Sequence, residues 1–254
     1  FRLGNLRYNS RNGENDMRLD KLIEEQLHTP RKTMKRLFQT GQVYVDGKIE
    51  RRPERNVEGA LHRIVVQGKQ LQTDDVYFLL NKPAGVVTAN HDQQHPTVID
   101  CLASADQRSD LYAVGRLDRD TEGLVLLTSN GQLGYALMHP EKAVTKCYDV
   151  VVNGCLTKTD QAAFAAGVVF HDGTTCLPAK LTILSAQEKQ SQAIVQITEG
   201  KFHQVKKMFL SRGVKVIGLK RTAIGPLTLP KDLATGHYRT LTQEELESLV
   251  EYFH

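Results

Sequence analysis

A charged loop enclosed by two apolar segments constrains this chain more than any other feature. Leu111–Val114 precedes the loop and Leu124–Thr128 follows it, and apolar runs of this length are typical of buried strands. The loop itself, Gly115–Gly123, begins and ends with glycine and is rich in arginine and acidic residues. A loop held between two buried strands presents its side chains from a rigid frame. We therefore expect the functional centre of the chain at this place.

The pattern along the chain predicts two domains and a short N-terminal extension. Residues 1–16 are polar and show no periodicity, so we expect a disordered extension, or sequence that precedes the start of the protein, since a methionine follows directly. Residues 17–71 form a small module. The polar stretch Gln67–Asp75 serves as a linker, with residues 72–75 outside both domains, and residues 76–254 form the larger domain.

The small module is expected to consist of two helices and a few short strands. Apolar residues recur at helical spacing in Leu19–Leu27 and again in Arg31–Gln39, and Thr29 with Pro30 can cap the second helix. The sequence Asp46-Gly47 between apolar residues predicts a hairpin turn. Strands are expected at Val43–Val45, Lys48–Ile49 and Ile64–Val66.

The second helix of this module has a strongly basic side. Its apolar residues Met34, Leu37 and Phe38 share one side, and the remaining positions hold four cations: Arg31, Lys32, Lys35 and Arg36. A helix of this kind can neutralise several phosphates of a nucleic acid at once. The alternative is a basic helix face that is only solvated.

The larger domain is expected to contain mostly antiparallel strands with a few helices. The expected strands are Tyr77–Leu80, Leu111–Val114, Leu124–Thr128, Tyr148–Val152, Leu177–Leu184, Gln192–Thr198, Val214–Ile217, Leu219–Ile224 and Tyr238–Leu241. The expected helices are Gln132–Met138, Gln161–Gly167, Phe202–Arg212 and Thr242–Tyr252, the last with a capping box between Thr242 and Glu245.

Composition excludes several classes of protein. The net charge of +4 and the pI near 8.8 permit nucleic acid binding without requiring it. The chain has no apolar run long enough to span a bilayer, no secretory signal and no glycine-rich phosphate loop, so we expect a cytoplasmic protein without a nucleotide cofactor. The four cysteines are too scattered for a zinc site, and we interpret them as structural packing residues: Cys101, Cys147, Cys155 and Cys176.

Four motifs in order identify a family resemblance. Gly115-Arg-Leu-Asp118, continued by Asp120–Leu124, resembles the central motif of pseudouridine synthases, in the branch that contains the RsuA-type enzyme of 16S ribosomal RNA. Leu80–Gly85, Lys146–Tyr148 and Glu199–Met208 are similar to further motifs of this family. In addition, residues 17–71 resemble the small αL-motif RNA-binding domain first recognised in a ribosomal protein of the small subunit.

The resemblance implies both a fold and a reaction. The implied fold is α+β, with the small RNA-binding domain and a larger, mixed but mainly antiparallel β-sheet catalytic domain with flanking helices. The implied reaction is the isomerisation of a uridine of ribosomal RNA to pseudouridine by a monomer, without metal or cofactor. Motif details favour a single uridine of 16S ribosomal RNA; the alternative is a uridine of 23S ribosomal RNA.

The resemblance also implies roles for residues of the charged loop. Asp118 matches the essential carboxylate, which can act as a nucleophile or as a base at the sugar, whereas Asp120 and Glu122 are the other acids on the loop. Arg116 matches the residue that fills the place of the extruded uridine and holds phosphate. A salt bridge from Arg116 to Asp120 or Glu122 is the alternative.

Other motifs supply the remaining site residues that the resemblance implies. Tyr148 would stack on the flipped uracil, and its hydroxyl could transfer protons. Lys206 would pair with Asp118 and keep this carboxylate ionised, with Lys207 as the open alternative. His203 is expected to be structural or to contact RNA, and the Lys82-Pro-Ala-Gly turn is expected to shape the backbone.

Two rival functions come from other classes. One is a ribosome-associated RNA-binding protein without activity, against which the intact Asp118, Tyr148 and Lys206 count. The other is a nuclease, which the absence of a paired-carboxylate metal site and of a His-based acid–base pair disfavours. The sequence leaves open which uridine is modified, and whether the substrate is free RNA or an assembly intermediate.

Overall fold

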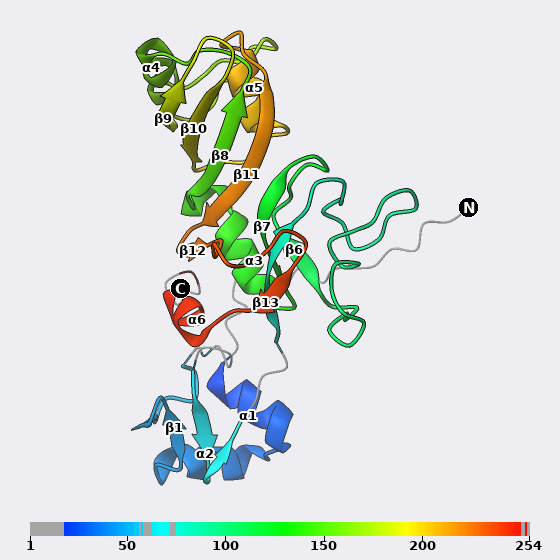
Figure 1. The fold of residues 1–254 in the computed structure, drawn as a ribbon. Coiled ribbons are helices and arrows are strands. Elements are labelled where there is room, and N and C mark those ends of the chain that lie inside the picture. Colours follow the sequence, from blue (N-terminus) through cyan, green and yellow to red (C-terminus); the bar gives the residue numbers. More distant parts are fainter. Residues whose placement is uncertain (1–17, 56, 58–61, 72–74, 250–251, 253–254) are drawn as a thin grey trace, which may run out of the picture. The chain divides into compact units, whose positions relative to one another are not determined.

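The computed structural model describes residues 18–55, 57, 62–71, 75–249 and 252, and the chain divides into two compact units, Phe1–Thr73 and Asp74–His254 (Figure 1). Each unit has a hydrophobic core of its own. The expected extension, residues 1–16, and most of the expected linker, residues 72–75, lie outside the described residues.

The small unit pairs two helices with a four-stranded sheet. Helices α1 (Leu19–Leu27) and α2 (Arg31–Gln39) have the expected bounds. The sheet has the order β2-β1-β3-β4 and is antiparallel throughout, with β1 Val43–Val45, β2 Lys48–Ile49, β3 Ile64–Val66 and β4 Lys69–Gln70. Its core contains the apolar faces of both helices and the inward residues of β1 and β3.

Two local predictions for the small unit were wrong. Pro30 occupies the N-cap position of α2 itself, and no side chain caps this helix. The polar stretch taken as linker contains strand β4, because Gln67 and Gly68 both adopt positive φ and turn the chain back onto β3. Polar composition alone does not separate a linker from a short edge strand.

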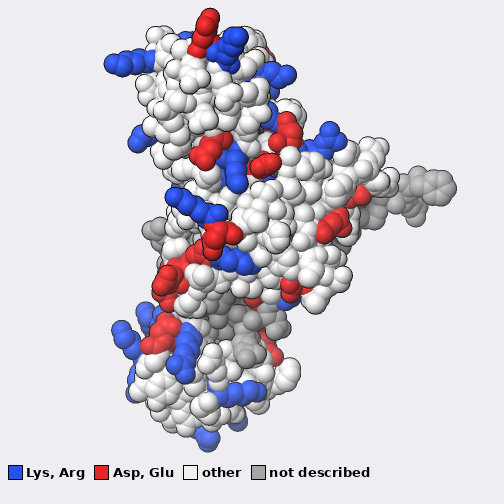
Figure 2. Space-filling model, viewed as in Figure 1, with Lys and Arg blue, Asp and Glu red and all other residues white. Residues whose placement is uncertain are grey.

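The basic side of α2 is exposed in the structure. Met34, Leu37 and Phe38 are buried in the core of the small unit. The four cations of the helix are all exposed: Arg31, Lys32, Lys35 and Arg36. Figure 2 shows blue Lys and Arg side chains over the small unit on the face drawn, with some acidic side chains among them.

The large unit is built on one nine-stranded sheet, which confirms the expected α+β class with a mixed, mainly antiparallel sheet. Its main order is β13-β5-β7-β11-β8-β10-β9, with β6 added to β7 and β12 to β11. Among the described strands of this sheet, only β7 and β11 pair in parallel. The strands are β5 Tyr77–Lys82, β6 Tyr112–Val114, β7 Glu122–Thr128, β8 Lys146–Val152, β9 Lys180–Ala186, β10 Ser191–Ile197, β11 Val216–Ile224, β12 Leu227–Thr228 and β13 Tyr238–Thr240.

Helices lie along this sheet and close its core. Helices α4 (Lys158–Ala166) and α5 (Gln204–Leu210) lie beside the half formed by β9, β10, β8 and β11, and α3 (Gly131–Met138) lies beside β6 and β7 (Figure 1). The tilted rings of Phe164 and Phe209, with centroids 5.0 Å apart, join α4 to α5 in the core. A short 3-10 helix η1 (Pro140–Lys142) and α6 (Gln243–Ser248) complete the unit.

Several bounds in the large unit differ from the predicted ones. The two strands expected around Gly218 are one strand, β11; Gly218 marks a register shift against β8, where an added Cβ would lie 3.3 Å from Val151. The expected helix from Phe202 begins only at Gln204, which leaves Phe202 in a loop. The C-terminal helix is shorter than expected, although Thr242 and Glu245 do form its capping box.

The cysteines only partly behave as predicted packing residues. All four are free, but Cys176 alone is buried, and burial raises the pKa of its thiol to about 11. Cys101 and Cys147 are half-buried, and Cys155 is exposed. Within the described residues, no helix is long and apolar enough to cross a membrane.

Gly123 lies where β7 and β11 pair in parallel, and its replacement should lower the stability of the protein. It adopts φ +106°, and an added Cβ would lie 2.2 Å from the Arg221 carbonyl oxygen on β11. We expect Gly123→Ala to lower the free energy of unfolding by about 3 kcal/mol or more, measured by urea denaturation. Gly131→Ala is the matched control, because open space surrounds Gly131; equal stability of the two variants would contradict the prediction.

Candidate active site

Hydrogen bonds from residues 82–88 hold the backbone of the charged loop in place. Thr88 donates from its hydroxyl to the Leu117 carbonyl (2.8 Å) and accepts from the Leu117 amide (3.1 Å). The Gly85 amide donates to the Arg119 carbonyl at 2.8 Å. These bonds fix the backbone on both sides of Asp118, so this carboxylate projects from a held loop.

Lys82 strengthens this anchor from inside the protein. Its side chain is 0% exposed, and its amine donates to the carbonyls of Pro83 (2.8 Å) and Arg119 (3.3 Å). Burial lowers the pKa of Lys82 to about 8. The lysine of the Lys-Pro-Ala-Gly turn therefore ties that turn to the charged loop, a contact that the expected backbone role did not specify.

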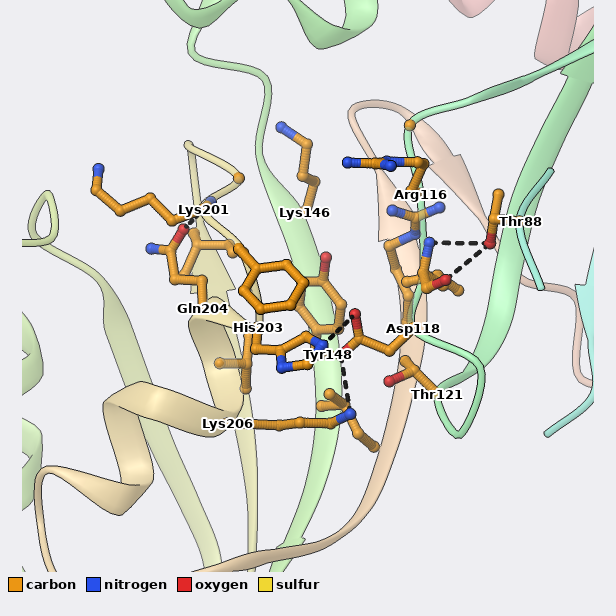
Figure 3. Close-up of a pocket in the computed structure, with 18 of the residues that line it drawn as sticks. Thr88, Arg116, Asp118, Thr121, Lys146, Tyr148, Lys201, His203, Gln204 and Lys206 are labelled. Atoms are coloured by element: carbon orange, nitrogen blue, oxygen red, sulfur yellow. Dashed lines mark hydrogen bonds and ion pairs between the residues drawn. The ribbon is translucent and has the colours of Figure 1, made fainter. Parts of the chain in front are cut away.

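Asp118 and Lys206 meet across the site. The Lys206 amine lies 2.8 Å from Asp118 Oδ2 (Figure 3), and it lies 2.6 Å from Asp120 Oδ1. His203 Nε2 lies 3.5 Å from the other Asp118 oxygen, Oδ1. Lys207, the alternative partner, points elsewhere: its amine lies 3.9 Å from Asp172. The structure thus brings Asp118 together with Lys206, not with Lys207.

Contacts within the ion cluster shift the pKa values of Lys206 and Asp120. Burial alone would lower the pKa of Lys206, but hydrogen bonds to Asp118 and Asp120 raise it above its ordinary value. The hydrogen bond from Lys206 lowers the pKa of Asp120. Lys206 and Asp120 therefore stabilise each other's ionised forms.

Tyr148 lies on β8 and faces a buried arginine on the neighbouring strand. Tyr148 is buried, and its register partner on β11 is Arg221, which is 1% exposed. Arg221 donates from Nε to the Leu124 carbonyl at 2.8 Å, whereas its Nη2 has no hydrogen-bond partner among the described residues. Sequence reasoning missed Arg221, because Lys220 and Thr222 on either side of it gave no sign that this arginine is buried.

Lys146 is a further buried cation, which sequence reasoning assigned to a motif but gave no role. Its amine donates to the Val144 carbonyl at 3.1 Å. Burial, with a smaller contribution from the nearby Arg221, lowers its pKa. Among the described residues, neither Lys146 nor Arg221 has a carboxylate partner.

One pocket of about 570 Å³ in the large unit is lined by Asp118, Lys146, Tyr148, Lys206 and Arg221. Arg116 lines it and is exposed, and in the described part of the chain it forms no ion pair with Asp120 or Glu122. The lining thus contains the Asp118–Lys206 ion pair and three cations that have no carboxylate partner among the described residues: Arg116, Lys146 and Arg221. No described cluster of His, Cys, Asp or Glu could hold a metal ion.

Comparison with known proteins links this geometry to RNA modification. Residues 76–211 match the model of a family described as RNA pseudouridylate synthase. The chain is 38% identical over 237 residues to the ribosomal small subunit pseudouridine synthase A of Escherichia coli K12, covering 92% of this chain and 100% of that protein. It is 37% identical over 236 residues to an uncharacterized RNA pseudouridine synthase, YtzG, of Bacillus subtilis, covering 92% and 99%.

A solved structure shows the same fold. The crystal structure of a pseudouridylate synthase, 35% identical in sequence, superimposes with a TM-score of 0.65. The match covers 92% of this chain and 99% of the other. The likeness therefore extends over both units and not only over the motifs.

Proposed function

Because this chain belongs to the RNA pseudouridylate synthase family, we propose that it isomerises a single uridine of 16S ribosomal RNA to pseudouridine. The observation that carries the reaction is the Asp118 carboxylate, held by Lys206 inside a pocket that also contains Tyr148. Support for the 16S substrate comes from the similarity to the small-subunit enzyme of Escherichia coli over nearly the whole chain.

The proposed reaction needs no co-reactant. The bond from N1 of uracil to C1′ of ribose breaks, the base turns, and a bond from C5 to C1′ forms; C5 loses a proton and N1 gains one. Asp118 serves as the nucleophile or base beside the sugar. Tyr148 covers the flipped base, and Arg116 occupies the place that the base has left.

Mapping of pseudouridine in ribosomal RNA tests this function. RNA from cells with and without the gene is compared at every uridine of 16S and 23S ribosomal RNA, and the deletion strain receives either the wild-type gene or Asp118→Asn. Loss of one 16S site, restored by the wild type alone, is the expected result. Loss of a 23S site instead would overturn the substrate, and an unchanged map would support a non-catalytic RNA-binding protein.

We propose further that the small unit supplies affinity and not chemistry. Replacing Arg31, Lys32, Lys35 and Arg36 with Gln should weaken RNA binding strongly, because exposed cations neutralise phosphates. The slope of log affinity against log salt should fall by about 0.7 to 0.9 for each phosphate that is no longer neutralised. Saturating RNA should restore most of the turnover.

Filter binding at several salt concentrations measures this effect. The matched control replaces four exposed lysines of the large unit with Gln: Lys158, Lys180, Lys189 and Lys215. Both variants lose the same charge, so only the position of the cations differs. An unchanged salt slope in the small-unit variant would mean that α2 does not touch phosphate.

A further inference from the structure

Phe202 is an exposed aromatic ring on the wall of the catalytic pocket. It lies in the loop between β10 and α5, and at 70% it is the most exposed large apolar side chain among the described residues. Single exposed apolar residues are common and need no explanation by themselves. Phe202 differs because it lines the same pocket as Asp118 and Tyr148.

The loop that carries Phe202 is held firmly. The Lys201 amide donates to the Gln204 side-chain oxygen at 2.8 Å, and Gln204 Nε2 donates to Glu199 Oε1 at 2.7 Å. Glu199 also accepts from the Leu177 amide at 2.9 Å and pairs with the Lys201 amine. Gln204, at the centre of this network, is buried. The ring is therefore presented on a fixed backbone.

The ring is also packed against the catalytic centre. Phe202 and His203 are stacked, with centroids 3.8 Å apart and an interplanar angle of 21°. His203 has a left-handed backbone, φ 53°, and its Nε2 lies 3.5 Å from Asp118. The Lys207 amine lies 5.5 Å from the Phe202 centroid and adds a cation–π contact. These contacts hold the ring near the reacting carboxylate while most of its surface stays open.

We propose that Phe202 is a stacking platform for the nucleobase next to the isomerised uridine. This inference rests on the proposed function. When a uridine leaves the RNA stack, the stacking of its neighbours is disturbed, and an exposed aromatic side chain can offer a new stacking surface to the neighbour that Arg116 does not cover. Tyr148 is buried inside the pocket, where the flipped uracil belongs, whereas Phe202 is exposed at the wall, where the adjoining base would arrive.

The size of the effect follows from known stacking energies. Loss of one base–aromatic stack weakens affinity by about 5- to 150-fold. We expect Phe202→Ala and Phe202→Leu to bind the substrate RNA more weakly in this range, with kcat within about threefold of wild type. Phe202→Trp should bind at least as well as wild type. Leu184→Ala, which removes another exposed apolar side chain (59%), is the matched control and should bind normally.

A double-mutant cycle, which combines a change in the protein with a change in the RNA, tests the contact between Phe202 and a base. The RNA is the ribosomal fragment in which the wild-type protein forms pseudouridine, made intact or without the base on the 5′ or the 3′ side of the target. If Phe202 stacks on one of these bases, removal of that base and Phe202→Ala should each weaken binding, and the two effects should not add. The base whose removal does not add to the effect of Phe202→Ala is the one that stacks on Phe202.

Three outcomes would overturn the inference without touching the proposed function, because wild-type turnover is the reference in each assay. Additive effects on both sides would show that Phe202 contacts neither base. Binding by Phe202→Leu equal to wild type would show that apolar area and not stacking matters. A fall in kcat with unchanged binding would show that Phe202 acts only on His203 and Asp118. Absence of wild-type turnover in every ribosomal fragment would refute the proposed function instead.

Discussion

Asp118→Asn is expected to reduce pseudouridine formation by at least about 1000-fold. The change keeps the size and polarity of the side chain but removes the negative charge that the proposed reaction requires at the sugar. The loop should not move, because its backbone is held by Thr88, Gly85 and Lys82. RNA affinity should therefore stay within a few-fold of wild type, so that the defect appears in kcat.

The neighbouring acids provide matched controls for this prediction. Asp120→Asn removes a charge that also contacts Lys206, and Glu122→Gln removes one at the start of β7. Both variants should retain most of the activity if Asp118 alone is catalytic. Single-turnover assays with radiolabelled RNA compare all of them. Measurable turnover by Asp118→Asn, together with its loss in either control, would transfer the catalytic role to another acid of the loop.

The sequence predicted local structure best where periodicity and termination signals agree. Helices α1 and α2 have the predicted bounds because apolar spacing, the proline before α2 and the glycine after it all point to the same ends. Strand β11 was predicted as two strands that end and begin beside Gly218, because glycine weakens the interior of a strand. Its role as a point of close approach to Val151 depends on the neighbouring strand β8, which sequence spacing does not reveal.

In the site, too, residues within sequence motifs were predictable, whereas contacts between segments distant in the sequence were not. The family motifs pointed to Asp118, Tyr148 and Lys206, which the structure gathers around one pocket. The register that sets Arg221 against Tyr148 was not predictable, because it joins strands far apart in the chain. Phe202 was predicted to be the first residue of a helix, but the helix starts two residues later. The exposure of its side chain depends on the conformation of the loop before α5, which the sequence did not predict.

Lys206→Met is expected to lower kcat at pH 7 by about 100- to 1000-fold. Methionine matches the length of the lysine side chain but leaves Asp118 and Asp120 side by side without their shared cation. The hydrogen bond from Lys206 that lowers the pKa of Asp120 is then lost. The acid limb of the pH–rate profile should move to higher pH, so the defect should be larger at pH 6 than at pH 8.5. Lys206→Arg, which keeps the charge, should lose less than about tenfold.

Lys207→Met separates this effect from a general loss of positive charge. Lys207 follows Lys206 directly, but its amine approaches Asp172 and not Asp118, so its removal should leave kcat and the acid limb unchanged. The hydrogen bonds that raise the pKa of Lys206 keep it charged throughout the assay range, so its own titration cannot imitate the shift. If Lys206→Met kept the wild-type acid limb and lost activity equally at every pH, Lys206 would position RNA and would not control the ionisation of Asp118.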